Sequence, residues 1–149
     1  MNTFKRLLTL YRKNGASRVP TEDYCTECLA GLLECDQELL SGFVNEVLNI
    51  SSEEQFKVFT QKTYILDGEM IRVDLVFESP SQICFLEMKV HSAEGEQQLE
   101  RYRRYLLHER KHQDKSVTLR YCTLYMERKE SFETDVMFEQ PAGLILPVF

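Results

Sequence analysis

Three charged residues lie within two segments of the sequence that read as β-strands, one alternating and one buried on both faces. Asp74 lies in the alternating segment 69–78, and Glu87 and Lys89 lie in the near-continuous apolar run 83–90. Removing an unpaired charge from water is costly, so such residues need either a partner or a function. Side chains two residues apart on a strand share a face. We therefore expect Glu87 and Lys89 to project together.

A hairpin between the two segments would bring a second carboxylate to the same place. A turn at 79–81 predicts that Asp74 pairs with Glu87, on one face and beside Lys89. Two carboxylates this close repel each other unless a cation lies between them, and Mg²⁺ favours carboxylate and carbonyl oxygens. We expect Asp74, Glu87 and the backbone carbonyl of Met88 to hold Mg²⁺, with Mn²⁺ able to substitute. A salt bridge among the three charged side chains is the simpler alternative.

The surrounding pattern of apolar residues predicts the elements that position these side chains. Helical spacing predicts helices at 3–13, 22–34, 39–48 and 93–112. Alternating, β-branched and apolar runs predict strands at 56–66, 69–78, 83–90 and 117–126, with a further strand-like segment at 143–149. The order predicts an α/β fold whose core is αβββαβ, a mixed sheet of four to five strands flanked by helices. On the second strand we expect one face to carry Ile71, Val73, Leu75 and Phe77, and the other to carry Arg72, Asp74 and Val76.

The helix predicted at 22–34 offers a third carboxylate. Its apolar stripe is formed by Cys25, Cys28, Leu29, Leu32 and Leu33. At 100° per residue, Glu22 lies within about 50° of the centre of this stripe and can reach the sheet, whereas Glu27 lies nearly opposite. Cys25 and Cys28 form a CxxC pair, but no second pair follows, so we expect them to pack in the core rather than to bind metal.

The arrangement D-x12-E-x-K across a strand hairpin resembles the PD-(D/E)XK nuclease superfamily, which has the restriction-endonuclease-like fold. Asp74 lies in RVDLVF, and Glu87 and Lys89 lie in FLEMKV. Val73 stands where the superfamily's name has proline, a position that varies in such proteins. The resemblance implies a metal-dependent nuclease that hydrolyses phosphodiester bonds in DNA.

Two helical segments extend the resemblance, which covers about residues 21–125 in the expected order. Gln98 and Tyr102 are similar to the QxxxY motif of the RecB-type branch. Glu22 opens a segment similar to the first-helix ExxxS/TxxLAxLL pattern of related bacterial nucleases. By this resemblance Glu22 would assist the Mg²⁺ site through a water. Gln98, Tyr102 and Arg101 would lie along the DNA path.

Lys89 has its own role in the implied reaction. It would position the attacking water and offset the charge of the transition state.

Two other functions of the protein stay open. An inactive copy of the fold would serve as a nucleic-acid- or protein-binding module, and a purely structural α/β domain would use the charged residues only as a buried ion-pair network. The intact D…ExK…QxxxY set favours activity, whereas a net charge of −6 argues against broad, non-specific DNA binding.

Charge and composition also indicate how the chain is organised. Residues 1–20 carry five basic residues and no acid, which predicts a basic helix or arm before a domain at 21–149. The apolar end at Phe149 predicts that the domain continues further. No apolar run is long enough to span a membrane and the N-terminus is too charged for a secretory signal, so we expect a cytoplasmic protein with reduced cysteines. A homodimer and a fusion to a further domain are both open.

Overall fold

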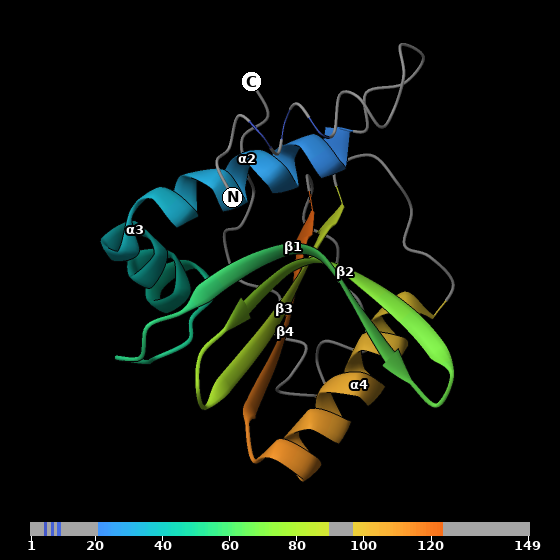
Figure 1. Ribbon diagram of the computed structural model, residues 1–149. Coiled ribbons are helices and arrows are strands. Elements are labelled where there is room, and N and C mark those ends of the chain that lie inside the picture. The colour runs from blue at the N-terminus through green and yellow to red at the C-terminus, as the bar shows by residue number, and fades with distance from the viewer. Residues whose placement is uncertain (1–4, 6, 8, 10–20, 90–96, 124–149) are drawn as a thin grey trace.

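The computed structural model describes residues 5, 7, 9, 21–89 and 97–123 of the chain (Figure 1). The helix predicted at 3–13 lies largely outside these residues, and the strand-like segment at 143–149 lies wholly outside them. Among the helices that the structure describes, none is long and apolar enough to cross a lipid bilayer.

Four strands form one mixed sheet in the order β1-β2-β3-β4. β1 (Lys57–Leu66), β2 (Glu69–Glu78) and β3 (Gln82–Lys89) are joined antiparallel, and β4 (Ser116–Thr123) runs parallel to β3. A parallel pair needs a crossover connection, which contains α4 (Gln98–Gln113). The predicted mixed sheet with its αβββαβ order is therefore confirmed.

Helices cover both faces of the sheet (Figure 1). α2 (Thr21–Cys35) and α3 (Gln37–Gly42) lie on one face, where α3 continues into the π-helical turn η2 (Phe43–Val47), and α4 lies on the other. Asp36 separates α2 from α3, because its carboxylate accepts backbone N–H groups at the start of α3. The chain therefore begins a new helix there instead of extending the first one.

The buried side of α2 differs from the predicted stripe. It is centred on Thr26, Ala30 and Leu33, which are at most 2% exposed. Leu32, which we expected within the stripe, is 60% exposed, so that part of the prediction is wrong. The physical reason is that small residues let the helix approach the sheet closely, and this approach selects the face with Ala30 over the face with Leu32.

The two faces of β2 do not alternate as predicted. Val73 and Val76, three residues apart, both pack toward α4, whereas Leu75 and Phe77 pack toward α2 and α3. The expectation that Val73 shares a face with Leu75 and Phe77 is therefore wrong. The alternation shifts by one residue at Asp74.

The cause of this shift is a matched irregularity in β1 and β2. Gln61 lies within β1 with a φ of 50°, in the left-handed region. Regular pairing between the strands skips Gln61 and Asp74 but resumes beyond them with an unchanged register. Because each strand carries an extra residue at the same level, the faces exchange while the register is kept.

Candidate active site

β2 and β3 stop pairing where the charged residues lie. Their backbone pairing follows the predicted register and ends at Leu75 and Leu86, so the predicted backbone pair between Asp74 and Glu87 is absent. Instead, Oδ2 of Asp74 accepts the N–H of Met88 at 3.0 Å. The side chain of Asp74 thus replaces a backbone acceptor, which fixes its carboxylate against β3.

Glu87 is almost fully enclosed, with 1% of its side chain exposed. Its Oε1 accepts from Nε2 of Gln98 at 2.8 Å and lies 2.6 Å from Nζ of Lys89. Its Oε2 lies 2.9 Å from the hydroxyl of Tyr102. Both carboxylate oxygens are therefore held, and the charge is compensated by the neighbouring lysine.

Gln98 and Tyr102 lie one turn apart on α4 and form one hydrogen-bonded unit. Nε2 of Gln98 donates to the hydroxyl of Tyr102 at 2.9 Å, and that hydroxyl lies 2.6 Å from the backbone carbonyl of Arg72. A hydroxyl carries a single proton, so Tyr102 donates either to Glu87 or to Arg72 at one time. Because Tyr102 is only 1% exposed, its hydroxyl serves the interior of the site.

The two carboxylates are difficult to ionise in this environment. Burial and the nearby charge of Asp74 raise the pKa of Glu87 to about 7, against the opposing effects of Lys89 and Tyr102. Burial likewise raises the pKa of Asp74, although Met88 N–H and Lys89 favour its charged form. Burial disfavours the charged form of Lys89, but its contact with Glu87 outweighs this effect and raises its pKa. An additional positive charge would therefore be favoured here.

The charged side chains open onto one polar cavity of about 290 Å³. The cavity lies between the start of α2, the first half of β2, the end of β3 and the start of α4. The structure brings together here every side chain that the sequence predicted for the site: Asp74, Glu87, Lys89, Glu22, Gln98, Tyr102 and Arg101.

Asp23 and Gln61 belong to the same site, although the sequence pattern did not single them out. Nε2 of Gln61 lies 3.3 Å from Oδ1 of Asp74 and 3.4 Å from Oδ1 of Asp23. The observed buried stripe of α2 places Glu22 and Asp23 about 50° to either side of its centre, so a correctly centred stripe predicts both acids. No feature of the sequence marks Gln61.

Arg101 lines the cavity and makes only a long contact with its acidic partner. Its Nη1 lies 3.8 Å from Oε1 of Glu69, while Arg104 makes a closer contact of 2.6 Å with Oε2 of the same residue. The Nε of Arg101 is buried and has no hydrogen-bond partner among the residues that the structure describes. The ion pair of Arg101 with Glu69 is therefore long, and its Nε–H is left unsatisfied in the described structure.

The donor set of the cavity fits a hard divalent cation. Asp74 and Glu87 supply carboxylate oxygens to its lining. Within the described parts of the chain, no three His, Cys, Asp or Glu side chains converge as a complete metal cluster. Mg²⁺ does not require one, because it is commonly bound through one or two carboxylates and keeps several waters.

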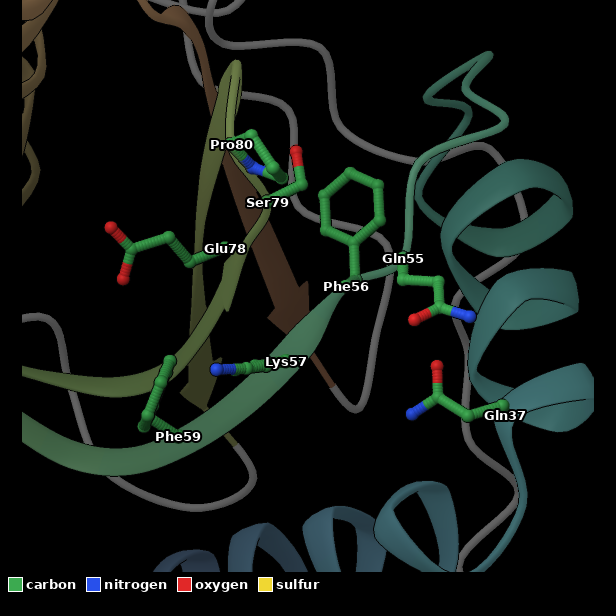
Figure 2. Close-up of a pocket in the computed structure, with 8 residues that line it drawn as sticks. All are labelled: Gln37, Gln55, Phe56, Lys57, Phe59, Glu78, Ser79 and Pro80. Atoms are coloured by element: carbon green, nitrogen blue, oxygen red, sulfur yellow. The ribbon is translucent and has the colours of Figure 1, made fainter.

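A larger cavity of about 500 Å³ lies by the turn between β2 and β3 (Figure 2). Figure 2 shows Gln37 and Gln55 facing each other on one side, while Glu78 points away from them. Glu78 is already bonded to Lys62 at 2.9 Å and to Lys115 at 2.8 Å. Two lysines compensate the carboxylate of Glu78, and Lys57 also lines the cavity, so its described lining lacks the excess of negative charge found in the smaller cavity.

One of three comparisons with known proteins gives a match. A family model described as the PD-(D/E)XK nuclease superfamily matches residues 2–141, a range that contains every residue of the smaller cavity. A search of curated proteins and a search of solved structures each return no match.

Proposed function

Because the chain belongs to the PD-(D/E)XK nuclease superfamily, we propose that it is a Mg²⁺-dependent nuclease that hydrolyses phosphodiester bonds in DNA. Its mixed four-stranded sheet flanked by helices is the restriction-endonuclease-like fold of that superfamily. The observation that carries the proposal is the convergence of Asp74, Glu87 and Lys89 on one polar cavity. Gln98 and Tyr102 further support a place in the RecB-type branch, because both contact Glu87.

In this proposal the acids of the cavity hold the metal ion. Asp74, Glu87 and the backbone carbonyl of Met88 would bind Mg²⁺, for which Mn²⁺ can substitute, and Glu22 would assist through a water. When bound, the ion supplies Lewis-acid polarisation of the phosphate and offsets its negative charge. The burial and mutual repulsion of the two carboxylates support this assignment, since a cation nearby restores their ionised forms.

Lys89 would act on the phosphate and on the attacking water. Its ammonium has three donors, and only one of them is needed for the 2.6 Å contact with Glu87. The other two can bind a phosphate oxygen and position a water. With 11% of its side chain exposed, Lys89 lies where a low dielectric strengthens its attraction to developing negative charge.

The start of α4 would face the nucleic acid. Gln98 and Arg101 line the cavity, and the guanidinium of Arg101, whose side chain is 35% exposed, is suited to donate to a phosphate oxygen. Tyr102 is enclosed, so we assign it to the orientation of Glu87 and through it to the handling of DNA. A short local patch of donors is compatible with the negative net charge of the chain.

The decisive experiment combines DNA substrates with metal ions. Plasmid, linear and single-stranded DNA should be cleaved in Mg²⁺ or Mn²⁺ and left intact in EDTA. Asp74→Ala and Lys89→Ala should lose cleavage and keep the circular dichroism spectrum of the wild type. Equal nicking by all three proteins would overturn the proposal. If the protein bound DNA but did not cleave it in either metal ion, the result would instead support the inactive binding module.

A further inference from the structure

We propose that Gln61 is a positioning residue of the nuclease site, whose backbone turns Asp74 toward β3 and whose amide holds Asp74 beside Asp23. The inference rests on the proposed function, because it assigns Gln61 a part in preparing Asp74 for a metal ion. Gln61 itself touches neither a phosphate nor the attacking water in this proposal.

The backbone of Gln61 is the first support. Left-handed φ values are unfavourable for residues with a Cβ atom, and Asn and Asp tolerate them better than Gln. Gln61 lies inside a strand, whereas the other described non-glycine residues with positive φ lie in turns or at element ends: Asn49, Asp67, Gln97 and Asp114. Strain of this kind persists where surrounding contacts impose it, and it is frequent at functional sites.

The consequence of this conformation is visible in the neighbouring side chains. Phe59 and Tyr64 are five residues apart on β1, yet both pack toward α4, and Lys62 lies over both rings at 4.4 Å and 5.2 Å from their centroids. Regular alternation would place Phe59 and Tyr64 on opposite faces. The exchange of faces thus occurs in β1 at Gln61 and in β2 at Asp74, which frees the carboxylate of Asp74 to reach Met88 of β3.

The side chain of Gln61 is the second support. Its Nε2 points one hydrogen at each of two carboxylates, Oδ1 of Asp74 at 3.3 Å and Oδ1 of Asp23 at 3.4 Å. With Met88 N–H on Oδ2, both oxygens of Asp74 have a donor. A neutral amide reduces the repulsion between the two acids without adding a charge that competes with a cation. Both contacts are long, so their effect is on orientation more than on binding energy.

Gln61→Gly separates this role from a merely structural one. Glycine adopts the left-handed conformation without steric cost, so the thermal midpoint should be unchanged or raised. Loss of the amide should weaken Mn²⁺ binding, measured by isothermal titration calorimetry, by about 10–100-fold and reduce cleavage by a similar factor. Gln61→Glu, which keeps the size and adds a third carboxylate beside Asp23 and Asp74, should impair cleavage as well.

Asn49→Gly is the matched control. Asn49 is an exposed amide residue with a φ of 53°, so its replacement relieves similar strain and should leave Mn²⁺ affinity and cleavage unchanged. Wild-type Mn²⁺ affinity and cleavage in Gln61→Gly would overturn the inference. The inference would also be overturned if the thermal midpoint of Gln61→Gly fell far enough for unfolding to explain its loss of Mn²⁺ binding and cleavage. Absence of both Mn²⁺ binding and cleavage in the wild type would overturn the proposed function itself, and this inference with it.

Discussion

The hydroxyl oxygen of Tyr102 lies 2.9 Å from Oε2 of Glu87, and this tyrosine oxygen also lies 2.6 Å from the backbone carbonyl of Arg72. This side chain therefore ties α4 to both β2 and β3 at the level of the candidate site. Since Glu87 is only 1% exposed, solvent has little access to replace a lost partner of its carboxylate.

Tyr102→Phe should lower the free energy of unfolding by about 1–3 kcal/mol, the usual cost of leaving a buried acceptor unpaired. The ring would keep its edge-on contact with Phe85, whose centroid lies 5.8 Å away. Urea denaturation measures the change. Tyr64→Phe is the control, because the Tyr64 hydroxyl is buried without a partner in the described structure and its removal should be neutral or stabilising. Equal losses in the two variants would contradict this explanation.

Asp74→Asn should reduce cleavage by at least about a hundredfold, because a direct metal ligand contributes several kcal/mol to the reaction. The folded state should be as stable as before or more stable, since the amide no longer repels Glu87. Cleavage assays, Mn²⁺ calorimetry and thermal unfolding test the three parts. Asp67→Asn, in the exposed turn of the same hairpin, serves as the matched control. Unchanged Mn²⁺ affinity in Asp74→Asn would refute the ligand assignment.

Lys89→Met should separate metal binding from catalysis. The ammonium of Lys89 lies 2.6 Å from Oε1 of Glu87, next to an oxygen that a metal ion would use. Its removal should keep or tighten Mn²⁺ binding, measured by calorimetry, while DNA cleavage falls. The exposed Lys57→Met should change neither property. A parallel loss of Mn²⁺ affinity and cleavage in Lys89→Met would show that this lysine supports binding instead.

Glu78 should give the fold an acid-sensitive contribution away from the active site. Burial disfavours its ionised form, but hydrogen bonds from Lys115 and Lys62 outweigh that effect and lower its pKa below the ordinary 4.5. A carboxyl with a lower pKa in the folded chain than in the unfolded chain adds stability above the unfolded value. That stability is lost as the pH falls through the folded value.

Glu78→Gln should therefore be less stable than the wild type by a constant amount above about pH 5, and the difference should shrink as the pH falls below about 4.5. Urea denaturation across the acid range measures both proteins. Glu53→Gln, at an exposed position, controls for the general effect of removing a negative charge. A difference that stays the same down to the lowest pH would mean that Glu78 gains nothing from its two lysines.

The secondary structure and the pairing of the sheet were largely predictable from local patterns. The alternation in 69–78 predicted β2 with its observed bounds, and the turn at 79–81 predicted the register of β2 with β3. The periodicity of apolar residues is averaged over many positions, so one residue that departs from it does not change the predicted strand or helix. The residues of the site were recognisable for a different reason: charged side chains inside apolar strands are costly unless they have partners.

Tertiary contacts decided how those residues meet. A local pattern predicts regular alternation through Asp74, but a left-handed Gln61 on the adjacent strand exchanges the faces and interrupts the regular pairing there. A left-handed φ is unfavourable for Gln61 in the isolated chain, and in the folded chain its Nε2 lies 3.4 Å from Oδ1 of Asp23 on a distant helix. The periodic spacing of apolar residues along a strand or helix, every two or 3.6 residues, does not predict such a contact, because the contact joins residues 38 positions apart.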